Sequence, residues 1–338
     1  MGAKGIDSPE VKADTRLIPP LGQGALFDRT VRAARALRMH HALLLTGSPG
    51  TGKSTVGRWI AGALLCPSDL DQEQPCGVCK TCRRVQTGQH PDLHLLAPEP
   101  GKREIKVEHV RELIRKLLRH AVEGRARVAL VDPASALNTE GQNALLKTLE
   151  EPGLHTYIVM CASNPEALLP TVRSRSERVG VRRLPPETIA RELSRRIPTR
   201  EAFFERAILT ARGSLGRALE ACTEQAVQLH DLVAEICSAN KPLRSVALVR
   251  QVLSIGEGPG IAQQNARSFL TALRDAAASH LRALAPPDGA VYVATESQPW
   301  TELLTLSLCA ERDLDLQIPP EQALVGLLVQ WQRRRFGT

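Results

Sequence analysis

The sequence predicts an α/β protein whose sheet is mainly parallel, followed by segments that are mostly helical. Two observations lead to this prediction. Strand-like apolar runs alternate with helical patterns from about residue 40 to about residue 180, as they do when crossover helices connect parallel strands. Beyond residue 180 the strand patterns stop, and apolar residues recur at helical spacing.

The predicted strands of the α/β part are short and apolar. They cover residues 43–45, 92–98, 127–132 and 156–163. The third contains four consecutive apolar residues, which is typical of a strand covered on both faces. The predicted helices between them cover residues 53–65, 110–118 and 143–151. Residues 66–92 are rich in Cys, Pro and Gly, so we interpret them as an insertion rather than a core element.

Helical patterns divide the rest of the chain. A helix is predicted over residues 184–196, where Pro185 and Pro186 suit the first turn. Apolar residues at helical spacing indicate two further helices, around Leu270, Leu273, Ala277, Leu281 and Leu284 and around Leu324, Leu327, Leu328 and Trp331. The runs "SIGEGPG" and "LAPPDGAVY" are predicted breaks between helices. We therefore expect a polar leader, an α/β domain, a small helical domain and a C-terminal helical domain, over residues 1–15, 16–183, 184–225 and 226–338.

Composition narrows the class of protein. The chain has 338 residues, a net charge of +8 and an aromatic content of 3%. A basic surface is compatible with nucleic-acid binding but also with an ordinary Arg-rich soluble protein, and so few aromatics argue against base-stacking platforms. The first fifteen residues contain no secretory signal, and no apolar run is long enough to span a membrane. We expect a cytoplasmic protein with no membrane association, whose cysteines are thiols or metal ligands.

Residues 47–55, "GSPGTGKST", form a complete phosphate-binding loop between a predicted strand and a predicted amphipathic helix. Its glycines let backbone N–H groups turn toward phosphate oxygens, and the helix adds its positive dipole end. Lys53 would reach the β- and γ-phosphates, and the Ser54 hydroxyl would bind magnesium. The sequence therefore predicts ATP or ADP with magnesium at this loop. The nucleotide-binding residues are Gly47, Gly50, Gly52, Lys53, Ser54, Thr55 and Asp132.

Asp132 ends the strand "VALVD", where its carboxylate would act on the magnesium ion, largely through water. An active ATPase of this type usually has a Glu next, which orients the attacking water, but here Pro133 follows. General-base assistance contributes about 10² to 10⁴ in rate. We therefore expect slow turnover or none, and we do not expect Glu140, Glu150 or Glu151 to replace the base.

Four cysteines, Cys66, Cys76, Cys79 and Cys82, follow the pattern C-x9-C-x2-C-x2-C. Four thiolates satisfy tetrahedral zinc and leave no open position, so this spacing predicts a structural zinc site over residues 66–82. Four free thiols and an iron–sulfur cluster are the alternatives. The remaining cysteines, Cys161, Cys222, Cys237 and Cys309, have apolar neighbours in sequence and are expected in the core.

These elements together resemble bacterial DNA polymerase III clamp-loader subunits of the AAA+ class, from about Gly22 to about Cys222. The motifs that carry the resemblance are "LGQ" (21–23), the phosphate loop, "PCGVCKTC", "NALLKTLEEP" (143–152) and "SNPEALLPTVRSRS". The first gap between cysteines is one residue longer than the family usually has. The resemblance implies that the C-terminal domain is a collar that holds a ring together, and that Ser163 and Asn164 lie at the first sensor, with either one facing the phosphate.

Departures from the family's motor members favour its non-motor, delta-prime type. Gamma/tau motors carry a Glu where this chain has Pro133, and an Arg in a "GS-x-R" second sensor where this chain has Gly216. Arg217 comes one position later, and one helical residue rotates a side chain by about 100°. The alternatives are an active gamma/tau-like ATPase motor and a stand-alone zinc-containing DNA-binding protein.

The retained "SR" of Ser174 and Arg175 matches the family motif whose arginine projects into the ATP site of the neighbouring subunit. The resemblance thus implies that Arg175 is an arginine finger in trans, which can contribute about 10³ to 10⁵ in rate. It also implies membership of the DNA polymerase III holoenzyme. The implied partners are gamma/tau and delta subunits in a pentameric ring, the sliding clamp and primed DNA.

Two groups of basic residues are expected to have structural rather than functional roles. We expect His40 and His41, just before the first strand, to pack or form hydrogen bonds rather than bind metal, because no partner ligands are spaced nearby. We expect Arg333, Arg334 and Arg335 to form a solvated helix terminus.

Overall fold

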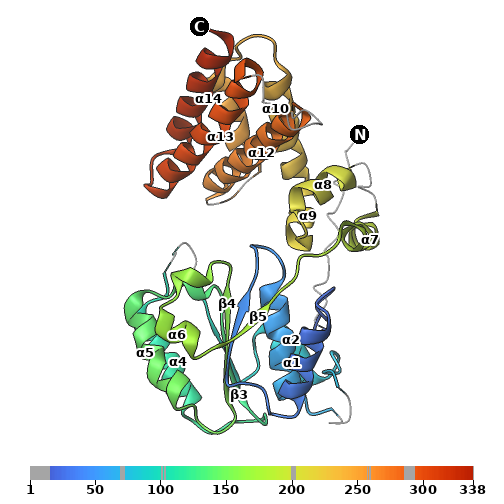
Figure 1. The fold of residues 1–338 in the computed structure, drawn as a ribbon, viewed down its shortest axis with the longest axis vertical. Coiled ribbons are helices and arrows are strands. Elements are labelled where there is room, and N and C mark those ends of the chain that lie inside the picture. Colours follow the sequence, from blue (N-terminus) through green and yellow to red (C-terminus); the bar gives the residue numbers. More distant parts are fainter. Residues whose placement is uncertain are drawn as a thin grey trace, which may run out of the picture. The chain divides into compact units, whose positions relative to one another are not determined.

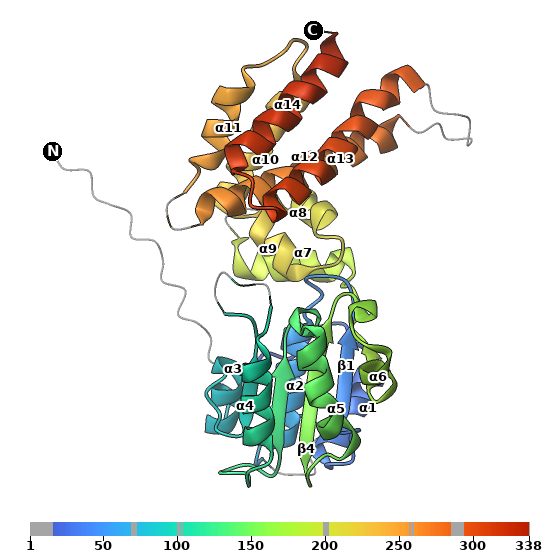
Figure 2. The same cartoon turned by 90° about the vertical axis from the view of Figure 1, so that its left-hand side faces the viewer.

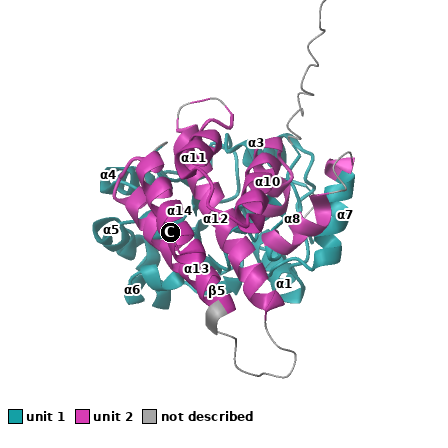
Figure 3. Ribbon diagram, turned by 90° about the horizontal axis from the view of Figure 1, so that it is seen from above, with its two compact units in different colours: residues 1–195, 212–216 teal, residues 196–211, 217–338 magenta. Residues whose placement is uncertain are grey.

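The computed structural model describes residues 16–68, 73–99, 102, 104–198, 203–256, 258, 260–284 and 294–337. The expected leader (1–15) and most of the "LAPPDGAVY" break lie outside these residues. Contacts divide the chain into two compact units, residues 1–195 with 212–216 and residues 196–211 with 217–338 (Figure 3). The expected boundaries between the four segments stay predictions.

A five-stranded parallel sheet forms the centre of the first unit, in the order β2-β3-β4-β1-β5. The strands are β1 (Ala42–Thr46), β2 (Leu93–Leu96), β3 (Arg127–Val131), β4 (Thr156–Ala162) and β5 (Glu177–Gly180). The four predicted strands are confirmed. The sequence prediction missed β5, because in "ERVG" only Val179 is buried.

Helices cover both faces of this sheet, with α1 and α2 on one face and α4, α5 and α6 on the other (Figure 1). Their bounds are α1 (Ala25–Arg35), α2 (Lys53–Leu65), α4 (Val107–Leu117), α5 (Thr139–Glu150) and α6 (Pro170–Ser174). Alternate β1 residues serve the two cores: Leu43 and Leu45 pack in the α1/α2 core, and Leu44 packs in the α4/α5 core. Burial on both faces explains why β1, β3 and β4 read as continuous apolar runs.

Residues 66–92 are not only an insertion, which corrects the sequence interpretation. They contain helix α3 (Lys80–Thr87), whose Cys82 and Val85 are fully buried in the core that α2 shares with the sheet (Figure 2). The Cys, Pro and Gly content concealed this short helix, since only two of its side chains face the core.

The second unit is entirely helical within the residues described. It contains the last residue of α7 (Pro186–Arg196) and then α8 (Phe204–Ala211), most of α9 (Leu215–Ala221), α10 (Glu224–Ser238), α11 (Ser245–Leu253), α12 (Ile261–Ala283), α13 (Ala294–Asp315) and α14 (Pro320–Phe336). The predicted apolar faces of α12 and α14 are largely confirmed, because Leu270, Leu273, Leu324 and Trp331 are fully buried in one core. No helix in the described parts of the chain combines the length and apolar character needed to cross a membrane.

Two expectations for this unit are wrong. Cys309 is exposed, although Cys161, Cys222 and Cys237 are buried as expected. Arg335 is not part of a solvated terminus: its guanidinium donates to the carbonyls of Ile236 and Cys237 and lies over aromatic rings of α13 and α14. A guanidinium has five donors and a flat face, so it can satisfy exposed helix-end carbonyls while it stacks on aromatics.

Candidate functional site

The phosphate loop connects the carboxyl end of β1 to the start of α2, the usual place for phosphate groups in parallel α/β sheets. Gly47, at φ 156°, passes so close to β5 that a Cβ would lie 2.7 Å from the carbonyl oxygen of Val181. Gly52, at φ 87°, is the N-cap of α2 and turns the chain into the helix in a left-handed conformation. The loop therefore presents backbone N–H groups and a helix N-terminus on the same side.

Lys53 lies across this loop. Its Nζ donates to the carbonyls of Gly47 and Ser48, at 2.9 Å each, and only 8% of the residue is exposed. Burial lowers the pKa of Lys53, while the charge of Asp132 opposes that shift. The charges of Lys53 and Asp132 are thus close enough to interact, with Lys53 in the loop that follows β1 and Asp132 directly after β3.

Ser54 has a partner that the sequence analysis did not foresee. Its hydroxyl accepts a hydrogen bond from Nη1 of Arg58, one helical turn later, at 2.9 Å. The Arg58 Nε is buried without a partner in the structure as described. The i, i+4 spacing on α2 was the available signal for this contact.

The other expected residues of the site lie at the carboxyl ends of neighbouring strands. Pro133 directly follows Asp132, and no carboxylate comes next in the chain. Ser163 and Asn164 follow β4 and are exposed, and the Asn164 side chain caps a short 3-10 helix by accepting from the Glu166 N–H at 3.1 Å. Gln23 is buried and accepts from the Arg182 N–H at 3.0 Å, which ties "LGQ" to the chain after β5.

Two further contacts join the phosphate loop to distant segments of the first unit. The guanidinium of Arg183 donates to Ser48 Oγ through Nε at 3.2 Å and Nη2 at 2.7 Å. The buried hydroxyl of Ser214 donates to the carbonyl of Gly50 at 2.6 Å. Sequence spacing gave no signal for either contact, since more than a hundred residues separate each pair.

Arg175 forms the C-terminal end of α6, away from any buried core. Its Nη2 lies 2.6 Å from Glu150 Oε1, and its Nη1 donates to the carbonyl of Thr171 at 3.2 Å. The side chain is 37% exposed, so the ion pair with Glu150 lies in solvent. The guanidinium is thus oriented by the last residue of α5, within the "NALLKTLEEP" segment.

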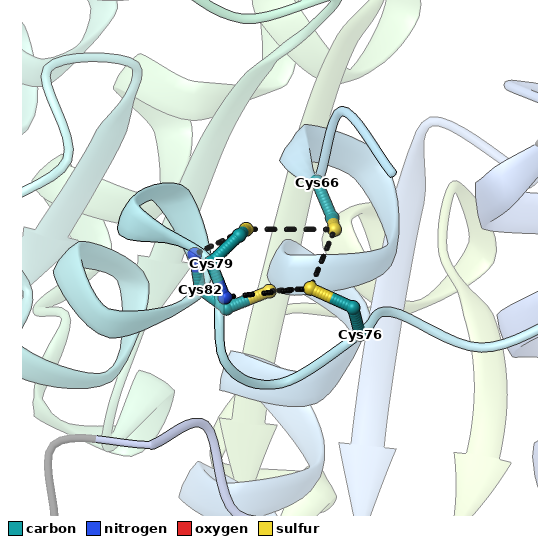
Figure 4. A group of neighbouring side chains, drawn as sticks. All are labelled: Cys66, Cys76, Cys79 and Cys82. Atoms are coloured by element: carbon teal, nitrogen blue, oxygen red, sulfur yellow. Dashed lines mark hydrogen bonds between the residues drawn. The ribbon is translucent and has the colours of Figure 1, made fainter. Parts of the chain in front are cut away.

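The four cysteines predicted from spacing converge on one point, as Figure 4 shows. Cys66 ends α2, Cys76 and Cys79 precede α3, and Cys82 lies in its first turn. The Sγ atom of Cys66 is 3.7 Å from that of Cys76 and 3.8 Å from that of Cys79, and those of Cys76 and Cys82 are 4.0 Å apart. Four sulfurs bound about 2.3 Å from a tetrahedral zinc lie about 3.8 Å from one another. The donor set therefore fits such a metal.

Hydrogen bonds around these sulfurs favour negative charge. The N–H groups of Cys79 and Cys82 donate to the sulfurs of Cys76 and Cys79, at 3.4 Å each. Hydrogen bonds, first from the Cys82 thiol and then from Ser68, lower the pKa of Cys66 to about 3 despite its burial. The same hydrogen bond between Cys82 and Cys66, together with burial, raises the pKa of Cys82. A second thiolate would thus be unfavourable beside the first unless a cation bound between them.

A buried arginine supports the cysteine cluster from α1. Arg35 is 3% exposed and donates to the carbonyls of Cys66 and Ser68, at 2.9 Å each. These two bonds fix the chain at the point where α2 ends and the cysteine module begins. No signal in the sequence indicated this role of Arg35, because a single arginine at a helix end has no distinguishing pattern.

The parallel sheet, the phosphate loop before α2 and the aspartate after β3 define a nucleotide-binding fold of the AAA+ class, followed by an all-helical part. A family model described as "DNA polymerase III, delta subunit" matches residues 22–185. Over these residues, just under half of the chain, the protein is similar to the delta-prime clamp-loader family of DNA polymerase III, with tau and gamma subunits as further relatives.

Individual relatives agree with this assignment. The chain is 40% identical over 194 residues to the DNA polymerase III subunit delta' of Escherichia coli, which covers 57% of this chain and 58% of that one. It is 45% identical over 138 residues to the delta' subunit of Yersinia pestis, which covers 41% and 40%. It is 34% identical to the tau subunit of Escherichia coli, over 57% of this chain and 30% of that one. The match thus spans about half the length of these delta' relatives.

One solved structure is similar over most of the chain. The DNA polymerase III gamma-subunit-related protein of Thermotoga maritima superposes with a TM-score of 0.50 over 90% of this chain and 99% of that one. The two chains are 17% identical. At this level of identity the similarity concerns the fold alone, and it supports the AAA+ class.

Proposed function

We propose that this chain is a delta-prime-like subunit of the DNA polymerase III clamp loader. In this proposal it acts as a scaffold and arginine-finger donor in a pentameric ring with gamma/tau and delta subunits, which loads the sliding clamp on primed DNA. The carrying observation is that a chain similar to this family has Pro133 after its magnesium aspartate and yet retains Arg175 on an exposed helix end.

The chain's own phosphate loop is proposed to bind ATP or ADP with magnesium but to turn it over slowly or not at all. Lys53 lies across the loop, and Asp132 is within electrostatic range of it, which supports binding. Pro133 can neither orient nor deprotonate a water molecule, and general-base assistance is worth about 10² to 10⁴ in rate.

Arg175 is proposed to act on the phosphate groups held by a neighbouring subunit. A guanidinium is permanently charged, and its planar fork fits developing phosphate charge. The ion pair with Glu150 limits the orientations of Arg175 but is solvent-exposed, so it costs at most about 1 kcal/mol to exchange for a phosphate.

The test is ATPase activity of the complex reconstituted with gamma/tau and delta subunits. Arg175→Ala should assemble normally and lower DNA-stimulated ATPase activity at least tenfold at the affected site. Arg173→Ala is the matched control, because Arg173 is two residues away and pairs with Glu166. Equal ATPase activity for wild type and Arg175→Ala would exclude the trans role.

The second candidate function is an active gamma/tau-like motor, which the complete phosphate loop favours. The isolated chain discriminates between the two candidates. Clear ATP hydrolysis that Lys53→Ala abolishes would support the motor and refute the non-motor proposal.

We propose a structural zinc ion as the occupant of the cysteine cluster. Its four sulfurs have the separations that tetrahedral zinc requires, and they leave no position open for water or substrate. The proposed role of zinc is to link the start of α3 to the end of α2, in addition to the packing of Val85 in the core.

A further inference from the structure

Arg183 places a second cation at the phosphate loop. The chain after β5 runs directly beneath the loop, where the Val181 N–H donates to the carbonyl of Thr46 at 2.7 Å. Two residues later, Arg183 donates through Nε and Nη2 to Ser48 Oγ. Among the residues that the structure describes, Arg183 has no acidic partner within ion-pair distance.

Lys53 and Arg183 converge on the same residue from two sides. Lys53 Nζ donates to the Ser48 carbonyl, and Arg183 donates to the Ser48 hydroxyl. Two cations that both bond to Ser48 can share one bound anion, which interacts favourably with each of them. At the edge of a phosphate-binding loop, the anion that fits is the terminal phosphate group of a nucleotide, which the loop lysine also reaches.

The backbone around Arg183 is fixed by three contacts. The Leu184 N–H donates to the carbonyl of Gly213 at 2.8 Å, and Ser214 bonds to Gly50 of the loop. Gly213, at φ 86°, packs so closely that a Cβ there would lie 2.6 Å from the Cβ of Arg183. Residues 183–184 and 213–214 are thus in contact with each other, and Ser214 also bonds to the loop. The backbone around Arg183 is therefore already ordered, so ligand binding by Arg183 costs little conformational entropy.

Gly216 has no side chain, so the second-sensor position of this chain carries no cation. A Cβ at Gly216 would meet only Ser214 Oγ, at 3.9 Å, so this side of the residue is open. Arg58, which donates to Ser54 Oγ, and Arg183, which donates to Ser48 Oγ, thus both add positive charge to the loop besides Lys53.

We propose that Arg183 binds the terminal phosphate of a nucleoside triphosphate held by the phosphate loop, exchanging Ser48 Oγ for phosphate oxygens. The inference rests on the proposed nucleotide binding by this loop and adds a specificity-determining residue to it. Because the terminal phosphate distinguishes ATP from ADP, Arg183 makes the site prefer ATP.

The test measures binding of ATP and ADP to the purified full-length chain by titration calorimetry. Arg183→Ala should weaken ATP about tenfold or more, as expected for loss of a charge-assisted hydrogen bond, and weaken ADP less than about threefold. Arg178→Ala is the charge-matched control, since Arg178 is exposed on the edge strand β5. It should leave both affinities unchanged, and Arg183→Lys should restore part of the ATP affinity.

The outcomes separate two kinds of failure. If the wild type binds neither nucleotide, the proposed nucleotide site fails and Arg183 loses its role with it. If the wild type binds and Arg183→Ala has the wild-type affinity for ATP, this inference alone is overturned. Equal weakening of ATP and ADP also overturns it, because it would indicate a structural role in holding the loop. Thermal melting curves of the three variants check that they fold.

Discussion

Asp92 offers a quantitative test of how the α/β core supports the site. It is 2% exposed and lies just before β2. Its Oδ1 accepts from the N–H of Val122 at 2.6 Å, and its Oδ2 accepts from those of Glu123 at 2.9 Å and Gly124 at 2.6 Å. One carboxylate thus bonds to three successive N–H groups of the connection between α4 and β3, the strand that ends just before Asp132.

The change to make is Asp92→Asn, which keeps the shape of the side chain. If the amide oxygen takes the position of Oδ2, two of the three N–H donors keep a neutral acceptor, but the Val122 N–H then faces an NH₂ group. A buried unsatisfied donor costs about 1–3 kcal/mol, and a bond to a charged acceptor is worth about 1 kcal/mol more than a neutral one. We therefore expect a loss of about 3 kcal/mol in the free energy of unfolding of the first unit.

The pH dependence has a definite sign. Burial alone would raise the pKa of Asp92, but the three backbone hydrogen bonds outweigh burial, and the pKa is lowered from its usual value. As pH falls below about 4, the unfolded chain binds this proton before the folded chain does. The contribution of Asp92 is therefore full above the unfolded pKa and is lost as pH falls through the folded pKa. Asp92→Asn should remove this part of the acid sensitivity.

Thermal unfolding followed by circular dichroism measures both effects. A loss of about 3 kcal/mol in a unit of this size lowers Tm by about 10 °C. Glu123→Gln is the control in the same turn, since the ion pair of Glu123 with Arg84 is exposed and worth about 1 kcal/mol at most. A Tm for Asp92→Asn within about 2 °C of that of Glu123→Gln would refute the reasoning.

Three further predictions concern other parts of the chain. Cys82→Ser should reduce zinc content measured by mass spectrometry and lower Tm, because a hydroxyl is a poor substitute for a thiolate ligand; unchanged zinc content would contradict the proposed site. Glu150→Gln should remove the ion pair of Arg175 and raise the ATPase activity of the reconstituted complex by no more than about fivefold, since an exposed pair is worth at most about 1 kcal/mol. A tenfold loss of ATPase activity would contradict this prediction. Gly57→Ala puts a Cβ 2.6 Å from a side-chain carbon of β3 and should destabilise the fold by about 1–3 kcal/mol in denaturant titrations, whereas Gly326→Ala, with nothing within 4 Å, should be neutral or stabilising.

The parts of the site that the sequence predicted correctly are encoded by neighbours in the chain. The phosphate loop needs glycines and a lysine at fixed spacing, so "GSPGTGKST" was sufficient to place it between β1 and α2. The cysteine cluster was predicted for the same reason, since each C-x2-C turn directs two sulfurs to one point. Helix α3 was missed because its position depends on the cluster rather than on its own apolar pattern.

Contacts between residues that are far apart in the sequence depend instead on the order of the strands in the sheet. Arg175 meets Glu150, and Arg183 meets Ser48, because the strand order β2-β3-β4-β1-β5 brings the ends of distant strands together. Nothing in the sequence indicates which partner each of these two arginines meets, because the partners lie far away in the chain. Arg335 shows the same limit, since only the packing of α10, α13 and α14 makes this terminal arginine a half-buried contact between helices.

By itself, then, the sequence determined the α/β class, the phosphate loop, the proline after Asp132 and the cluster of four cysteines. All of these depend on residue type and local backbone geometry. The tertiary structure alone decided which charges converge on the loop and what orients Arg175. The physical reason is that electrostatic contacts depend on distance in space, and the order of the strands in the sheet sets that distance.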